Sequence, residues 1–233
     1  MVDRDELQPP PDDFSIAGEE KEERAGELDR LISLSDGVFA FAMTLLIVSV
    51  AVPQMSDDDA RIRLHHDIVD LWPQVLSYVI GFLVIGFLWS SHRRIFARVG
   101  DYDDRLVKLS ILLLMFVAFL PFPTGILGQY AFLAFPAVLY AMIIAAISVL
   151  FVIIIDHLDG NRQLMTRNGK NFDFARAKTR HLVTGTFFLL SIPISLVAPG
   201  YGQAFWILLF FNHQISERLL PHLPRRFHER GHP

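Results

Sequence analysis

Six apolar runs, most of them long enough to cross a lipid bilayer, constrain this chain more than any other feature of its sequence. A spanning helix needs about 20 mostly apolar residues. Because the bilayer interior offers no water to pair backbone groups, such runs are expected to be helices. We predict an all-α membrane protein, since the chain lacks the alternation of about ten residues that marks an outer-membrane barrel. The predicted spans are Leu31–Val52, Leu71–Ser90, Leu106–Leu127, Ala131–Ile155, Leu182–Ala198 and Gly202–Ile215, the last two being the weakest.

Basic residues are distributed unevenly among the connections between these runs. The second and fourth connections and the C-terminal tail are rich in arginine and lysine, whereas the third and fifth connections hold none. The first connection holds Arg61 and Arg63 among several aspartates. Cytoplasmic loops carry the excess of positive charge in membrane proteins. The alternation therefore predicts six spans, each crossing once, with both termini in the cytoplasm.

The chain divides by charge into three parts. Residues 1–29 are acidic and proline-containing, residues 30–220 hold the predicted spans, and residues 221–233 form a basic tail. The acidic part is expected to be partly disordered and to become helical towards Arg30. It lacks the basic start and apolar centre of a signal peptide. The sequence contains no cysteine, which excludes disulfides and thiolate metal sites.

The first span is unusually polar for a helix that contacts only lipid. It opens with Arg30, Ser33, Ser35 and Asp36, and Thr44 lies further along. A carboxylate near hydrocarbon is costly unless it has a partner or water. We therefore expect this span to face something polar. Since each chain has one such helix and one helix cannot enclose a pore, a pore would need several copies of the chain.

One face of the first span has two interpretations. The residues concerned follow one another at helical spacing and are apolar apart from one hydroxyl. This stripe can be a packing seam, which the pattern alone favours, or a pore wall in which an apolar constriction controls hydration. The hydroxyl can also bond to its own helix carbonyl. The stripe consists of Phe41, Thr44, Leu45, Val48 and Val52.

A polar cluster is expected to join the first two spans at their cytoplasmic ends. Arg30 and Asp36 lie about 9 Å apart along the helix axis and on different faces, so they are poor direct partners. Trp89 and His92 of the second span are predicted to lie at the same depth. Unpaired polar groups there would be costly. We therefore predict a network that includes Ser35 as well.

Other function classes find little support in the sequence. His65, His66 and Asp67 are adjacent, and consecutive helix residues point about 100° apart, so they cannot converge on one metal ion. No glycine-rich phosphate loop, HExxH or GxSxG string is present. We predict neither an enzyme nor a bound cofactor. A small-solute or proton-coupled transporter is the alternative to a channel, although it would be expected to carry a charge at the centre of a span.

Three elements occur in order and resemble one family. The first span contains Arg30 and then Leu34-Ser35-Asp36, followed by GVFAFAMTLL. Trp89 and His92 form a W-x-x-H element, and the third span contains LLLMFVAFLPFPT. The composite resembles the bacterial relatives of the lysosomal potassium channel called transmembrane protein 175. The family has phenylalanine at the position of Leu34, and Ser110 stands where it has asparagine.

The resemblance implies a specific architecture and activity. It implies a homotetramer in the inner (plasma) membrane with six spans per subunit, in which the four first spans line a central pore that conducts potassium ions. It implies no TVGYG filter, and this sequence contains none. Phe41 is then the constriction, and a ring of Thr44 contributes to potassium preference. Arg30, Ser35, Asp36, Trp89, His92 and Ser110 become an assembly network, and the partners are other copies of the chain and membrane lipids, not nucleic acid.

Overall fold

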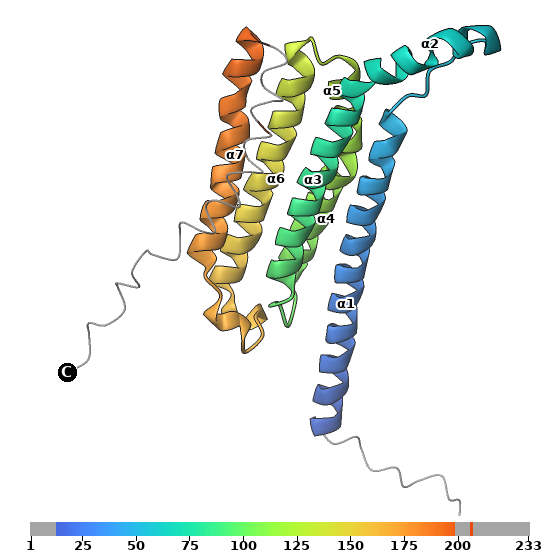
Figure 1. Cartoon of the computed structure of the whole chain (residues 1–233). Helices are drawn as coiled ribbons and strands as arrows, with labels where there is room; N and C mark the ends of the chain where they lie inside the picture. Colours follow the sequence, from blue (N-terminus) through green and yellow to red (C-terminus); the bar gives the residue numbers. More distant parts are fainter. Residues whose placement is uncertain (1–12, 199–205, 207–233) are drawn as a thin grey trace, which may run out of the picture.

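The described part of the chain is all-α, which confirms the helical class predicted from hydropathy. The computed structural model describes residues 13–198 and Trp206. Figure 1 shows the helices as a bundle with α1 along one side. The elements are α1 (Asp13–Leu45), η1 (Leu46–Ser49), α2 (Asp57–Asp70), α3 (Trp72–Phe96), α4 (Asp104–Phe119), α5 (Pro121–Gln129), α6 (Ala134–Gly160), η2 (Arg162–Leu164), η3 (Gly169–Asn171) and α7 (Phe174–Val197).

Five helical segments among the described residues are long and apolar enough to cross a membrane. Their bounds are Glu22–Ser49, Trp72–Phe96, Asp104–Gln129, Ala134–Gly160 and Phe174–Val197. They correspond in order to the first five predicted spans. The predicted sixth span lies outside the described residues except for Trp206, which is fully buried. Its ring stacks on Tyr140 at 5.1 Å and lies 5.3 Å from the ring of Phe188.

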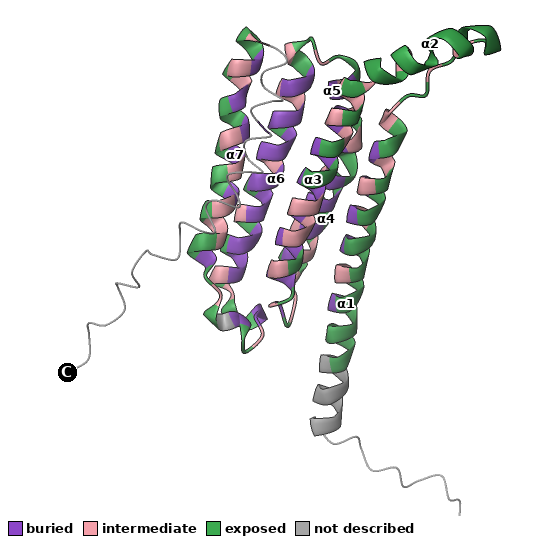
Figure 2. Ribbon diagram, viewed as in Figure 1, coloured by how far each residue is buried: buried purple, intermediate pink, exposed green. Residues whose placement is uncertain are grey.

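The core is built around α6, and α1 lies at the periphery. Helix α6 packs against α4, α5 and α7, whereas α1 packs against α3 and α4. In the most apolar part of α6, 61% of the residues are buried, against 22% in α1. Figure 2 shows the same contrast, with α6 largely buried and α1 exposed along much of its length. A helix that is apolar on all sides, as α6 is, belongs in the centre of a bundle.

The first span ends earlier than predicted, and its end is not α-helical. The α-helix stops at Leu45, a 3-10 turn continues to Ser49, and Val50 is extended. The reason lies in the local sequence IVSVAVP. β-Branched residues have low helix propensity, and Pro53 disfavours helical backbone at the residue before it. The α-helical spacing assumed for Val48 and Val52 therefore does not hold.

Helix α2 lies in a connection where no helix was predicted. Ser56 caps it by accepting a hydrogen bond from the backbone N–H of Asp59, and three aspartates occupy its first turn. Acidic residues at that end are favourable because of the helix dipole. None of its residues is buried, and Figure 1 shows it extending away from the bundle near the C-terminal end of α1 and the start of α3. The sequence prediction relied on apolar runs and therefore missed α2, which is polar.

The third span consists of two helices, α4 and α5, separated at Leu120. Helix α4 ends at Phe119, and Pro121 and Pro123 follow at the start of α5. Proline lacks the backbone N–H that an α-helix interior requires, so it favours a new helix start here. Helix α5 then approaches α3 closely. A Cβ atom built on Gly128 would lie 2.9 Å from the Cα of Gln74, and one built on Gly81 would lie 2.8 Å from a methyl group of Thr124.

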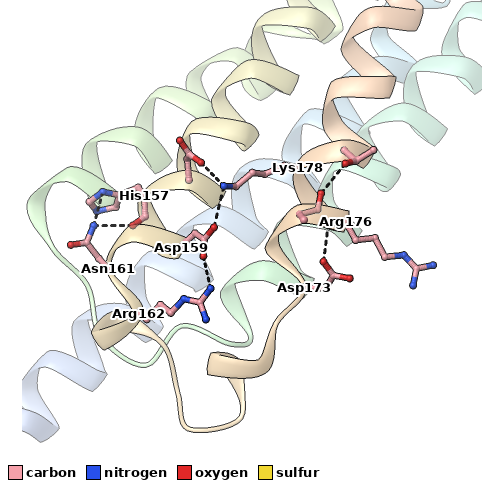
Figure 3. A network of polar contacts seen from close by, with 10 residues as sticks. His157, Asp159, Asn161, Arg162, Asp173, Arg176 and Lys178 are labelled. Atoms are coloured by element: carbon pink, nitrogen blue, oxygen red, sulfur yellow. Dashed lines mark hydrogen bonds and ion pairs between the residues drawn. The ribbon is translucent and has the colours of Figure 1, made fainter. Parts of the chain in front are cut away.

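Polar contacts hold the end of α6 and the start of α7 together. Lys178 forms ion pairs with Asp156 and, at 3.2 Å, with Asp159, while Arg162 binds Asp159 at 2.7 Å. Figure 3 shows Lys178 pointing towards α6. Helix α7 begins at Phe174, where the Asp173 side chain accepts from a backbone N–H, so the helix that carries the fifth span starts eight residues before the predicted Leu182. The predicted connection at residues 160–181 therefore includes the first two turns of α7.

A second contact ties the start of α4 to α6. His157 Nε2 donates to both carboxylate oxygens of Asp103, at 3.0 and 2.8 Å. Partial burial opposes the charged form of Asp103. Hydrogen bonds from Leu106 N–H and His157, with the charge of nearby Arg105, outweigh that effect and lower the pKa of Asp103 below its ordinary value. This carboxylate is therefore charged at neutral pH.

The close approach of α3 and α5 predicts opposite effects for the same substitution at two glycines. Gly128→Ala is expected to destabilise the fold by about 1–3 kcal/mol, because the added methyl meets the backbone of Gln74. Gly86→Ala is the control: its Cβ would meet nothing within 4 Å, and alanine favours a helix by about 1 kcal/mol. Thermal unfolding in detergent measures both, and equal shifts would contradict the tight contact.

Candidate functional site

Helix α1 packs on its own chain through a single face. The buried residues follow one another at intervals of three, four or seven, as expected for one side of an α-helix. Phe39 is 0% exposed, and a hydroxyl group, that of Ser35, lies among these apolar side chains. The buried set is Leu28, Ser35, Phe39 and Ala42 of α1, continued by Leu46 of η1.

The opposite face of α1 is apolar and uncovered in this chain. Phe41 is 63% exposed and Val48 is 76% exposed, although both are large apolar side chains. Leu34, Ile47 and Val52 are exposed as well. Surfaces of this kind mark contacts with lipid or with another protein chain. Phe41 is therefore not buried against the other helices of its own chain.

The predicted stripe is only partly a single surface. Phe41, Thr44 and Val48 lie on the exposed side, whereas Leu45 is half-buried. Val52 is exposed but follows the end of the helix. Ile47 joins the exposed side and was not among the predicted residues. It was missed because the 3-10 turn changes the spacing from about 3.6 to about 3 residues per turn.

Thr44 makes the hydrogen bond to its own helix that the sequence analysis gave as one possibility. Its hydroxyl donates to the backbone carbonyl of Phe41 at 2.8 Å. A hydroxyl oxygen has two acceptor lone pairs in addition to its hydrogen. Since the residue is exposed, the oxygen can accept a bond from water or contact a cation while its hydrogen stays on the carbonyl. The bond therefore fixes the position of the hydroxyl hydrogen and leaves the oxygen lone pairs available as acceptors.

Asp36 and Trp89 meet across the first two spans. The indole Nε1 of Trp89 donates to Oδ1 of Asp36 at 2.8 Å. Arg93, one turn along α3, lies with its guanidinium 5.5 Å from the centre of the same indole ring. A hydrogen bond to a carboxylate is stronger than one between neutral groups. The contact therefore fixes the rotation of α1 relative to α3.

The other residues of the predicted network are placed differently. His92 is buried between aromatic rings, stacked on Phe96 at 4.1 Å and 5.5 Å from Phe39. Its Nε2 has no hydrogen-bond partner among the described residues. Ser35 and Ser110 are also buried, and each donates to a carbonyl of its own helix.

Arg30 is exposed on α1, six residues before Asp36. Within residues 13–198 and Trp206, its side chain makes no hydrogen bond or ion pair. Of the six predicted network residues, the single chain therefore joins only Asp36 and Trp89 by a direct bond.

A contact that the sequence did not reveal holds the segment just after η1 against the start of α3. The side-chain Oε1 of Gln74 accepts a hydrogen bond from the backbone N–H of Ala51 at 2.9 Å. This N–H lies just beyond η1, where the helical pattern has ended. A glutamine at the start of an apolar helix belongs to no recognised sequence motif, so nothing in the sequence indicated this hydrogen bond. The rotation of the first span is thus fixed near both of its ends.

Comparisons with known proteins place the chain in a family. The profile described as "Endosomal/lysosomal potassium channel TMEM175" matches residues 30–121. A potassium channel of Streptomyces collinus is 33% identical over 194 residues, which cover 75% of this chain and 88% of that relative. The chain belongs to the TMEM175 family. The resemblance inferred from the sequence is confirmed.

Two further findings agree with membership of the TMEM175 family. A potassium channel of Chamaesiphon minutus is 30% identical over 79% of this chain and 93% of its own length. The crystal structure of a lysosomal potassium-selective channel TMEM175 homolog from the same organism superposes with a TM-score of 0.71 at 27% identity. That match covers 82% of this chain and 98% of the other. TMEM175 is a family of ion channels, not of enzymes.

The contact between Asp36 and Trp89 predicts energetic coupling. Asp36→Ala and Trp89→Phe should each lower the stability of the purified protein, but the double variant should lose less than the sum. We expect a coupling energy of about 1.5–3 kcal/mol, the usual range for a hydrogen bond to a charged group. Denaturant or thermal unfolding of all four proteins gives the value. Additive losses would mean that the bond does not stabilise the fold.

Proposed function

We propose that this protein is a potassium channel in which the exposed face of α1 lines the pore. The observation that carries the proposal is the uncovered apolar face with Phe41 and an oriented Thr44 hydroxyl, in a chain of the TMEM175 family. The relatives from Streptomyces collinus and Chamaesiphon minutus are named potassium channels. Residues of this face would contact water and ions in the assembled channel, not lipid alone.

The channel is proposed to be a homotetramer of subunits with six spans each. Each chain contributes one α1, and a single helix cannot surround an ion path. Four copies of the exposed face can surround one, and their contacts would cover apolar surface that the single chain leaves open. Trp206 supports a sixth span because it is buried against Tyr140 and Phe188 in the bundle.

The orientation follows from charge. The connections rich in arginine and lysine lie at one end of the spans, which places them in the cytoplasm. Both termini are then cytoplasmic, and the membrane is the plasma membrane of the cell. With this orientation Thr44 lies one turn outward from Phe41, and α2 lies outside the cell.

The constriction is proposed to be a ring of Phe41 side chains. An apolar neck opposes ion entry because nothing replaces the hydration shell that the ion would lose. Leu45, Val48 and Val52 continue the apolar wall outwards. Conduction would require the neck to widen or to fill with water. The Thr44 oxygens beside it offer acceptors that partly replace water around a potassium ion.

Reconstitution into liposomes tests the proposal as a whole. The full chain should have the mass of four subunits in detergent and should release a potassium gradient in vesicles. Reversal potentials under bi-ionic potassium and sodium conditions give the selectivity. A transporter would show saturable flux coupled to protons or solute. A stable monomer as the only species, or vesicles without ion flux, would disprove the channel.

Phe41→Ala is expected to raise ion flux and weaken selectivity, because a wider neck lets ions pass with their water. Because Phe41 is exposed in the subunit, stability should change little. Phe39→Ala is the matched control: it removes the same ring from the buried face of α1 and should cost about 3–5 kcal/mol of stability. Flux and unfolding of both variants are measured. Unchanged conductance in assembled Phe41→Ala channels would place the neck at Leu45 or Val48.

Thr44→Ala is expected mainly to reduce the preference for potassium over sodium, since it removes the acceptor oxygen beside the neck. Thr44→Ser keeps the hydroxyl and its bond to the carbonyl of Phe41, so it should retain most of the preference. Permeability ratios from reversal potentials compare the two. Equal ratios in both variants would show that the hydroxyl does not contribute.

The residues at the inner ends of α1 and α3 are proposed to serve assembly. Asp36→Ala should lower the recovered fraction of tetramer more than it changes the selectivity of tetramers that form. The reason is that Asp36 bonds to Trp89 and thereby sets the rotation of α1, on which contacts between subunits depend. Size-exclusion chromatography and reversal potentials separate the two effects. A change of selectivity with intact assembly would make Asp36 an ion site.

A further inference from the structure

A basic pocket lies at the inner end of the bundle, away from the exposed face of α1. Its volume is about 460 Å³, and it is bounded by the end of α3, the start of α7 and the connection before α7. Four arginines line it against a single carboxylate, that of Asp173. The arginines are Arg94 and Arg98 near the end of α3, and Arg176 and Arg180 in the first two turns of α7.

The wall of the pocket is held in place by backbone contacts. Thr166 donates its backbone N–H to the carbonyl of Arg98 at 2.9 Å, and its hydroxyl donates to the same oxygen at 3.1 Å. Any side chain at Gly169 would collide with this carbonyl. Phe172 lies under the guanidinium of Arg98, 4.9 Å from it. The connection between α6 and α7 is thereby fixed against the end of α3.

The floor of the pocket holds a buried polar group. His181 is 2% exposed and stacks on Phe151 at 4.2 Å. Its Nδ1 has no hydrogen-bond partner among the described residues. A buried ring nitrogen without a partner is costly unless a ligand or water pairs with it. The imidazole therefore adds a polar contact below the guanidinium groups.

The arginines lie at the depth of lipid headgroups. Helix α7 has 24 residues and is therefore about 36 Å long, whereas the hydrocarbon core is about 30 Å thick. About one turn of α7 must therefore extend beyond the hydrocarbon, and the charged side chains of Arg176, Lys178 and Arg180 favour placing it at the start of the helix. Figure 3 shows Arg176 extending to the side of α7 opposite Lys178, which points towards the α6 carboxylates. Arg176 is thus directed away from those carboxylates.

We propose that this pocket binds the phosphate of an anionic phospholipid headgroup from the inner leaflet. A guanidinium group can donate two parallel hydrogen bonds to the oxygens of one phosphate. Basic pockets between the cytoplasmic ends of membrane helices bind anionic lipid headgroups. The occupant would bridge α3 and α7 and so stabilise the inner end of the bundle. This site goes beyond the proposed channel function and does not depend on it.

Binding of short-chain lipids to the full-length protein in non-ionic detergent tests the site. Dioctanoyl phosphatidylglycerol should bind at least roughly tenfold more tightly than dioctanoyl phosphatidylcholine, since a net negative headgroup suits four arginines. The double variant Arg176→Gln/Arg180→Gln should weaken phosphatidylglycerol binding by roughly tenfold or more. Arg176→Gln alone alters an exposed residue, so it reports on binding without endangering the fold.

Arg167→Gln is the matched control, because Arg167 is exposed in the same connection and does not line the pocket. It should leave the affinity for phosphatidylglycerol unchanged. Equal losses in the control and in the pocket variants would overturn the site. Glycerol 3-phosphate distinguishes the source of the phosphate: displacement of the lipid at similar concentrations would show a soluble ligand and overturn the lipid assignment. Failure of dioctanoyl phosphatidylglycerol to bind would overturn the proposal, whatever the result for potassium flux.

Discussion

The one-sided packing of α1 is the constraint on which the proposed channel depends. Phe39 and Leu46 bury one face in the chain's own bundle, and Phe41 and Val48 remain exposed on the other. In lipid, apolar side chains gain little by leaving the hydrocarbon for another helix, so packing and polar contacts decide which helix faces associate. The bonds from Trp89 to Asp36 and from Ala51 to Gln74 therefore matter, because they fix which face of α1 points outward.

The rest of the bundle is closely packed and forms a rigid frame beside α1. Helix α6 is buried on most of its sides, and α3 and α5 approach so closely at Gly128 that no side chain fits between them. Interiors packed in this way resist deformation. The exposed face of α1 and the basic pocket between α3 and α7 lie in different parts of this frame. Ion conduction and lipid binding are therefore proposed for separate regions of one subunit.

Particular residues show why the sequence predicted some features and not others. The five described spans were visible because hydropathy averages over about 20 residues. The start of α7 was missed because Arg176, Lys178 and Arg180 make it polar, although Asp173 caps it as a helix. Helix α2 was missed for the same reason. The link between Asp36 and Trp89 was foreseen because both residues were placed at one depth, whereas the burial of His92 between rings required coordinates.

The sequence by itself determined the all-helical class, the order of the described spans and the family, because these follow from apolar run length, loop charge and short motifs. It placed the important polar residues on the first span. Only the tertiary structure decided which side of α1 is covered, where its helix ends, and that four arginines distant in sequence line one pocket. The reason is physical: periodicity states which residues share a face, but only packing against neighbouring helices decides which face is buried.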